Sequence, residues 1–222
     1  MNAARGIFIT GTDTGVGKTV VAVALLRALV ASGHRAVGMK PVSAGMEPDG
    51  SVNADVVALH EASNVDAPIA DRNPFALVPA IAPHLAAARA GVVIDLAVVA
   101  AAYARLASRC DVVVVEGAGG VLVPVDATHD MLDMAANLQL PVVLVVGMRL
   151  GCLNHALLSA AAIHSRGLRF AGWVANCIDP QMRAVEANVE TLAARLPAPR
   201  IATIPWGASP VLSPAVIFGP VR

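Results

Sequence analysis

The chain has 222 residues, of which 56% are hydrophobic and 14% charged, and its acidic and basic residues balance to a formal net charge of zero. This length fits a single domain with a full core, so we expect residues 1–222 to form one domain. A balanced charge gives no electrostatic attraction to nucleic acid or to an anionic membrane, and we expect neither as a partner. Hydropathy is high, but no uninterrupted apolar run reaches the roughly 18 residues that a membrane span needs.

The N-terminus and the cysteines point to a cytoplasmic protein. The first apolar run begins within a few residues of the start and leaves no room for a signal peptide. Cys110, Cys152 and Cys177 are widely spaced, without a C-x-x-C pair or a histidine cluster. The cysteines therefore predict neither disulfides nor a zinc site.

Six apolar runs predict strands, and their continuous Val/Ile content is typical of strands that are covered on both faces. Helical stretches lie between most of them, and this alternation predicts an α/β fold, a doubly wound and mostly parallel sheet in a three-layer αβα arrangement. The tail from Ser209 to Arg222 has no helical pattern and is not assigned. The expected strands are 7–10, 36–40, 112–115, 142–146, 171–175 and 201–204, and the expected helices include 20–31, 96–107, 153–165 and 183–196.

Ligands of such sheets bind beyond the carboxyl ends of the strands, so the polar residues that follow the runs are expected to converge. These residues are Thr14 to Thr19, Lys40, Glu116, Gly147 to Gly151, Asn176 and Pro205.

The stretch from Gly11 to Thr19, GTDTGVGKT, follows the first run and precedes a helical pattern. Glycines let backbone N–H groups surround phosphate oxygens, and the helix that follows presents its positive end to the same anion. Lys18 is expected to reach the β- and γ-phosphates and the Thr19 hydroxyl to bind Mg²⁺. The stretch is similar to a P-loop, although Thr12 stands where the strict motif has its first glycine. The predicted phosphate-binding residues are Gly15, Val16, Gly17, Lys18, Thr19 and Val20.

Two carboxylates, Glu116 and Asp55, are candidate metal ligands. Glu116 ends the run 112–115 and is followed by small residues, and Mg²⁺ commonly takes one or two carboxylates together with phosphates. Asp55 is the other candidate metal ligand. A solvated acid at a strand end and a helix cap are the ordinary alternatives for Glu116 and Asp55, respectively.

Lys40 is a further candidate site residue. It ends the second apolar run and lies in the stretch MKPVSAG. A solvated lysine is ordinary there, so position alone does not assign it. The combination of blocks is more specific, and it resembles the dethiobiotin synthetase family over about residues 6–207. The blocks are GTDTGVGKT, Lys40-Pro41-Val42, the stretch 115–120 (VEGAGG), the stretch 150–155 (LGCLNH), the stretch 172–176 (GWVAN) and Ile204-Pro205-Trp206.

The resemblance implies an ATP- and Mg²⁺-dependent ring closure. CO₂ adds to one amine of 7,8-diaminopelargonate as a carbamate, ATP phosphorylates the carbamate, and the second amine closes a cyclic urea. Lys18 and Lys40 are the implied catalytic residues, and Thr19, Asp55 and Glu116 the implied metal ligands. The resemblance also implies a homodimer, in which the loop 151–154 contacts the substrate carboxylate across the two-fold interface. It assigns Thr14, Ser43, Gly151, Cys152 and Asn154 to the substrate, and Gly117, Ala118, Gly119, Asn176 and Pro205 to the nucleotide.

Two positions depart from the family pattern. Some members carry an acidic residue where this chain has Gly15, and some place the substrate-binding serine at the position of Ala44. Either Ser43 replaces that serine, or the contact is lost.

Three other functions are open to a chain with a P-loop. A deviant P-loop ATPase that positions cargo carries a second lysine early in its loop, where this chain has Asp13. An amidotransferase of the cobalamin pathway needs a glutaminase domain, for which 222 residues leave no space. A small-molecule kinase would form a phosphorylated product without requiring CO₂.

Overall fold

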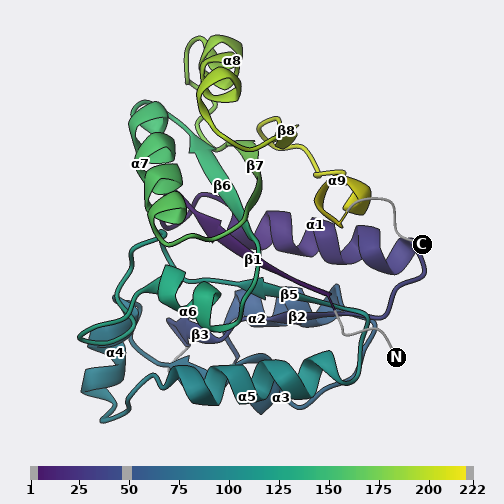
Figure 1. The fold of residues 1–222 in the computed structure, drawn as a ribbon, viewed down its shortest axis with the longest axis vertical. Coiled ribbons are helices and arrows are strands. Elements are labelled where there is room, and N and C mark those ends of the chain that lie inside the picture. Colours follow the sequence, from purple (N-terminus) through teal and green to yellow (C-terminus); the bar gives the residue numbers. More distant parts are fainter. Residues whose placement is uncertain (1–4, 47–51, 219–222) are drawn as a thin grey trace.

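A computed structural model describes residues 5–46 and 52–218 (Figure 1). In these residues a six-stranded parallel sheet has the order β2-β5-β1-β6-β7-β8, so β1 lies between β5 and β6. All six predicted strands belong to this sheet, whose order the sequence left open. The strands are β1 (Arg5–Gly11), β2 (Ala36–Met39), β5 (Val112–Glu116), β6 (Val142–Met148), β7 (Phe170–Cys177) and β8 (Arg200–Ile204).

Helices cover both faces of the sheet, as the continuous apolar runs predicted. Ile7 and Ile9 of β1 are buried in one hydrophobic cluster with α1 and α2, whereas Phe8 is buried in another with α5, α6, α7 and α8. Figure 1 shows α1 and α5 on opposite sides of β1. The three-layer αβα prediction is thereby confirmed. These helices are α1 (Lys18–Ala31), α2 (Ala54–Glu61), α5 (Leu96–Ala107), α6 (Met131–Asn137), α7 (Cys152–Ser165) and α8 (Val185–Arg195).

A small second sheet follows β2 and was not predicted. It pairs β3 (Val42–Ala44) with β4 (Phe75–Leu77) in parallel, with Val42 opposite Phe75. The short helices α3 (Ile69–Arg72) and α4 (Pro83–Arg89) flank β4 in the chain. Strands of three residues carry too few side chains for a period to be visible in the sequence.

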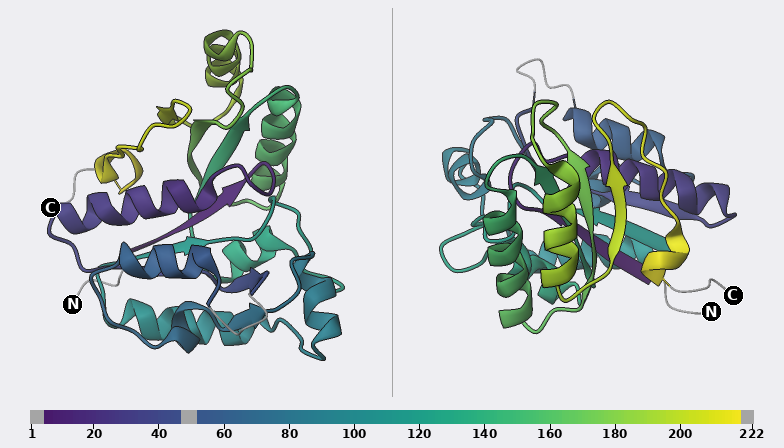
Figure 2. Two further views of the ribbon diagram at one scale, coloured as in Figure 1. Left: turned by 180° about the vertical axis from the view of Figure 1, so that it is seen from behind. Right: turned by 90° about the horizontal axis from the view of Figure 1, so that it is seen from above.

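The tail, which the sequence left unassigned, packs on α1. It forms the short helix α9 (Pro214–Phe218), and Leu212 and Ile217 are buried in the hydrophobic cluster of α1. Both views in Figure 2 show α9 in yellow close to α1. Residues 219–222 of this tail lie outside the described part of the chain.

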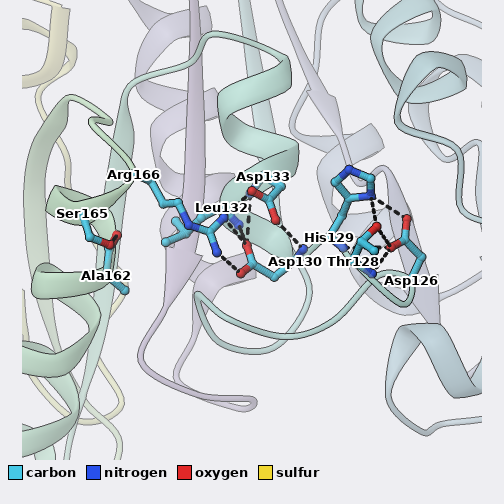
Figure 3. A network of polar contacts seen from close by, with 9 residues as sticks. All are labelled: Asp126, Thr128, His129, Asp130, Leu132, Asp133, Ala162, Ser165 and Arg166. Carbon is cyan, nitrogen blue, oxygen red and sulfur yellow. Dashed lines mark hydrogen bonds and ion pairs between the residues drawn. The ribbon is translucent and has the colours of Figure 1, made fainter.

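Figure 3 shows how the loop between β5 and α6 is held. Asp130 caps α6 by accepting hydrogen bonds from the backbone N–H groups of Leu132 and Asp133, and the Asp133 side chain accepts one from the Asp130 N–H. Arg166, directly after α7, pairs with both carboxylates, and its Nη2 lies 2.7 Å from Asp130 Oδ2. The start of α6 is therefore tied to the end of α7. Among residues 5–46 and 52–218, every helix is too short or too polar to cross a bilayer.

Candidate active site

The P-loop leaves β1 and enters α1 through Gly17, whose φ of 90° lies in the left-handed region that favours glycine. A Cβ on Gly17 would lie 2.1 Å from Nδ2 of Asn176, a contact that side chains do not make. That same Nδ2 donates a hydrogen bond of 2.8 Å to the Val16 carbonyl. The end of β7 therefore supports the loop directly, and this support requires glycine at position 17.

Asp13 organises the first half of the loop. Its carboxylate accepts from the Thr14 N–H at 2.7 Å and from Nη2 of Arg149 at 2.5 Å, while its main-chain carbonyl accepts from Nζ of Lys18 at 2.9 Å. Arg149 follows β6, so the segment after β6 contacts the P-loop, as the strand-end rule predicted. Lys18 is buried. Burial and the neighbouring ammonium of Lys40 lower the pKa of Lys18 to about 8, although Glu116 partly opposes the shift.

A cluster of charges lies where β2 and β5 end. Nζ of Lys40 donates to Glu116 Oε1 at 2.5 Å and to Asp55 Oδ2 at 2.6 Å, and the Thr19 hydroxyl donates to the same Glu116 oxygen at 2.8 Å. The strand-end rule thus brings Thr19, Lys40 and Glu116 together. Asp55 joins them from the first turn of α2, which Asn53 caps by accepting from the Asp55 N–H at 3.1 Å. The Asp55 carboxylate is therefore not the cap of this helix.

Burial sets the protonation of this cluster. Glu116 is 1% exposed, and burial raises its pKa although Lys40 acts in the opposite direction. Burial also disfavours the charged forms of Lys40 and Asp55, but their mutual attraction and that of Glu116 for Lys40 outweigh it. The pKa of Lys40 is accordingly raised and that of Asp55 lowered, so both groups are charged at neutral pH. Desolvation strengthens such interactions because the local dielectric is low.

Glu116 has one buried oxygen, Oε2, that makes no hydrogen bond within the described residues. An unpaired buried carboxylate oxygen is costly, so this atom points to a missing partner. Within residues 5–46 and 52–218, no three His, Cys, Asp or Glu side chains are grouped as a complete metal site. Mg²⁺ does not need such a group, because it usually keeps several waters and binds one or two carboxylates together with phosphates.

These side chains open into one cavity of about 710 Å³. Its wall combines the P-loop, the charged cluster and the start of the β5–α6 loop with an apolar side from the segment before α4. Of the predicted site residues, those that line it are Thr14, Gly15, Gly17, Lys18, Thr19, Val20, Lys40, Asp55, Glu116, Ala118 and Gly119. Val16 and Gly117 lie behind this wall, and both are buried.

Ser43 does not line the cavity, whereas Ala44 does. Alternate residues of a strand face opposite sides, and the buried Ser43 hydroxyl donates to Oδ1 of Asn73 at 3.0 Å, away from the cavity. The wall therefore has a methyl group at position 44. A role for Ser43 in binding substrate stays a prediction that this geometry does not support.

The remaining predicted residues lie outside this wall. Asn176 is buried against the P-loop, and Pro205 is exposed directly after β8. Gly151 starts α7 with a φ of 94°, Cys152 is buried, and Asn154 is exposed. Residues 151–154, which were expected to form a loop, are the N-cap and the first residues of α7, and they do not contribute to the cavity of their own chain.

Sequence reasoning missed Asn73 and the apolar segment 80–83, and it included Arg149 only as part of the strand-end segment 147–151. Asn73 and Arg149 were single polar residues without a recognisable spacing. Ala80, Ile81, Ala82 and Pro83 form part of the cavity wall, but apolar residues carry no chemical signal. Only the three-dimensional contacts identify them.

The comparisons with known proteins agree with this geometry. A family model described as an AAA domain matches residues 5–211. The ATP-dependent dethiobiotin synthetase BioD of Xanthomonas euvesicatoria pv. vesicatoria (strain 85-10) is 54% identical over 201 residues, which are 90% of each chain. The protein of that name from Nitrosospira multiformis is 50% identical over 206 residues, 93% of this chain and 90% of the relative.

Solved structures of lower similarity show the same fold. The septum site-determining protein MinD of Pyrococcus horikoshii OT3, complexed with Mg-ADP, aligns with a TM-score of 0.61 and 17% identity, covering 91% of this chain and 81% of that one. The MinC:MinD complex of Aquifex aeolicus gives 0.59 and 20% over 91% and 81% of the respective chains. At this identity the likeness shows the fold alone. Since synthetases share at least half of the aligned residues over 90% of their length, the chain belongs to the family of ATP-dependent dethiobiotin synthetases.

Proposed function

We propose that this protein closes 7,8-diaminopelargonate and CO₂ into dethiobiotin at the expense of ATP, releasing ADP and phosphate. The observation that carries the proposal is the cluster of Lys18, Thr19, Lys40, Asp55 and Glu116 on one cavity, in a chain of this family. The reaction needs a site that holds several anions together, and a phosphate loop beside a buried lysine has this property.

The chemistry has three balanced steps. One amine attacks CO₂ and loses a proton, which gives a carbamate. A carbamate oxygen then attacks the γ-phosphorus of ATP, which forms a mixed anhydride and releases ADP. The second amine attacks the carbamate carbon and loses a proton, the bond to the phosphate oxygen breaks, and phosphate leaves as the ring closes. This last step is intramolecular, and well-oriented intramolecular reactions reach effective molarities of about 10⁵–10⁸ M.

The residues of this chain act by charge and position. Lys18 and the N–H groups at the start of α1 would hold the β- and γ-phosphates. Lys40 faces the same cavity and would balance the carbamate and the negative charge that moves during phosphoryl transfer. None of the three steps requires a covalent nucleophile, and Cys152, being buried outside this cavity, is not needed as one.

Mg²⁺ fits the oxygen atoms of this site. The unpaired Oε2 of Glu116 and the hydroxyl of Thr19 would hold it, with Asp55 as a third donor. When bound, the ion would neutralise charge on the transferring phosphoryl group. Lys40 already shares Glu116 and Asp55, so the same carboxylates would keep its ammonium beside the phosphates.

The other assignments extend the proposal to the nucleotide and to a second subunit. Asn176 and Pro205 would contact the adenine, and Gly151, Cys152 and Asn154 would bind the substrate carboxylate of a neighbouring chain in a homodimer. Gly151, Cys152 and Asn154 lie outside the cavity of their own chain, as residues that complete the site of another subunit must. We further propose that the enzyme acts in the cytoplasm.

The proposal is tested by measuring ATP turnover and product together. Purified protein is supplied with ATP and Mg²⁺, with the diamine and bicarbonate added singly and in combination. We expect ADP and dethiobiotin in equal amounts only when both are present. A phosphorylated product without bicarbonate would indicate a kinase, and ATP hydrolysis independent of both would indicate a switch-type ATPase.

A further inference from the structure

We infer that Asn73 is a positioning residue that sets the place of Lys40. Asn73 lies between α3 and β4 and is 6% exposed. Its Nδ2 donates a hydrogen bond of 2.6 Å to the main-chain carbonyl of Lys40, and its Oδ1 accepts one of 3.0 Å from the Ser43 hydroxyl. The inference rests on the proposed function insofar as Lys40 is taken as a catalytic group.

The main chain of Lys40 depends on this contact because β2 has ended. β2 is an edge strand that stops at Met39, and the residue after Lys40 is Pro41, which has no N–H. The N–H of Lys40 donates to the Arg72 carbonyl at 2.8 Å, and the Lys40 carbonyl accepts from Asn73. Lys40 is 6% exposed, so a carbonyl without this partner would be buried and unpaired.

The position of the Lys40 main chain determines where its ammonium group lies. Nζ of Lys40 is held at 2.5 Å from Glu116 and 2.6 Å from Asp55, so a small displacement of the backbone breaks or lengthens these ion pairs. A misplacement of about 1 Å at a catalytic group can cost about 10²-fold in rate. Asn73 thus acts on the reaction through Lys40 without lining the cavity itself.

Asparagine suits this place because its amide is both donor and acceptor. A carbonyl can only accept, so it requires the Nδ2 side, which leaves Oδ1 for the Ser43 hydroxyl. An aspartate would oppose the Lys40 carbonyl with a second oxygen. An alanine would leave both the carbonyl and the hydroxyl unpaired.

The local fold has other supports, so loss of the Asn73 amide is expected to loosen Lys40 without unfolding the chain. β3 and β4 remain paired in register, and the Phe75 N–H donates to the Pro41 carbonyl at 3.1 Å. These bonds begin beyond Lys40. The side chain of Asn73 is therefore the contact specific to the Lys40 carbonyl.

The test is a double-mutant cycle with Asn73→Ala, Lys40→Gln and the pair of substitutions, assayed by single-turnover product formation and by nucleotide Kd. We expect Asn73→Ala to lower kcat/KM for the diamine about 10- to 100-fold and to change the nucleotide Kd less than threefold. In the Lys40→Gln background the same substitution should change the residual rate less than threefold, because its target is gone. A residue that only stabilises the fold would lower both rates by the same factor.

Asn64→Ala is the matched control. Asn64 holds the other end of β2 in a similar way, donating to the His34 carbonyl at 2.9 Å and accepting from the Ala36 N–H at 2.8 Å. We expect it to lower the melting temperature but to leave kcat/KM within threefold of wild type. Asn73→Ser is carried through the same cycle in case Asn73→Ala does not fold.

The inference is overturned by equal losses in the two Lys40 backgrounds, by activity of Asn73→Ala within threefold of wild type, or by failure of both Asn73 variants to fold. A similar loss of activity in Asn64→Ala would also count against it. If wild-type protein itself makes no dethiobiotin, the proposed function fails, which is a separate outcome.

Discussion

At the scale of single residues, the two carboxylate oxygens of Glu116 have different surroundings. One oxygen accepts from Lys40 and Thr19, and the other is buried and unpaired. We predict that Glu116→Gln lowers kcat by roughly 10²–10³ and raises the Mg²⁺ concentration needed for half-maximal activity, because an amide is a poor ligand for a hard cation. The measurement is a Mg²⁺ titration of turnover, with the exposed Glu190→Gln as control. Near wild-type activity at limiting Mg²⁺ would remove Glu116 from the metal site.

Residues 43 and 44 differ in the face of β3 that they occupy. Ala44 lines the cavity, and Ser43 is turned toward Asn73. We predict that Ala44→Ser lowers KM for the diamine about 2- to 10-fold, since a net hydrogen bond is worth about 0.5–1.5 kcal/mol, and leaves KM for ATP unchanged. Steady-state kinetics with each substrate varied in turn checks this. An unchanged or higher KM for the diamine would show that no substrate amine or oxygen lies within reach of position 44.

At the scale of elements, the loop 126–130 is held by a charge pair that titrates. Asp126 accepts from the backbone N–H groups of Thr128 at 2.7 Å and His129 at 2.8 Å, and its second oxygen lies 2.8 Å from Nδ1 of His129 (Figure 3). The Thr128 N–H and the His129 ring hold the pKa of Asp126 well below its usual range, and Asp126 raises the pKa of His129. The stability due to Asp126 is lost as pH falls through its folded pKa, and that due to His129 is lost as pH rises through its folded pKa. Both are fully present between about pH 4 and 6.5, the ordinary values of the two groups.

We predict that Asp126→Asn returns the pKa of His129 toward about 6.5. The histidine C2 proton signal is followed by NMR from pH 4 to 9 in both proteins. If His129 titrates at the same pH in both proteins, the pair does not form in solution.

Elements differed in how far the sequence could predict them. Five of the six strands of the main sheet were found because each has at least four consecutive buried residues. The sixth, β8, was found from the run 201–204 alone, since only Ile204 is buried in it. β3 and β4 were missed because three residues show no period and their pairing joins segments 33 residues apart, as the partners Val42 and Phe75 show. The order of the strands could not be predicted either. Parallel strands are joined by crossover connections, and the local sequence pattern does not show beside which strand the next one lies.

The candidate site divides in the same way. Lys40, Glu116 and Thr19 follow from the rule that ligands bind at the carboxyl ends of parallel strands, and the structure brings them within hydrogen-bond distance. Asp55 joins them only through the placement of α2 against β2, which the spacing of Asn53 and Asp55 could not distinguish from a cap. Asn73 depends entirely on the second sheet. The contacts that short elements make in the folded chain therefore could not be predicted from the sequence.

At the scale of the whole molecule, apolar side chains are exposed around the start of α7. Leu150 is 95% exposed and Leu158 of α7 is 62% exposed, whereas neither Gly151 nor Asn154 lines the cavity of its own chain. Exposed apolar side chains next to predicted substrate residues are consistent with an interface between two copies, because such patches mark protein contacts. A two-fold pair would place residues 151–154 of each subunit at the other subunit's site, since a two-fold interface uses the same surface of both subunits.

Complementation tests this arrangement. A Lys18→Ala chain keeps residues 151–154 intact, and an Asn154→Ala chain keeps the P-loop intact. We expect each homodimer to be inactive. In a heterodimer with shared sites, one site combines the two damaged parts and the other combines the two intact parts. Random pairing of equal amounts makes half of all dimers mixed, so the unsorted mixture should recover about a quarter of wild-type activity and the isolated heterodimers about half, with the KM of the wild-type enzyme. The measurement uses two affinity tags to isolate verified heterodimers. If these heterodimers remain inactive while wild-type chains treated in the same way recover, residues 151–154 do not complete the site of the other subunit.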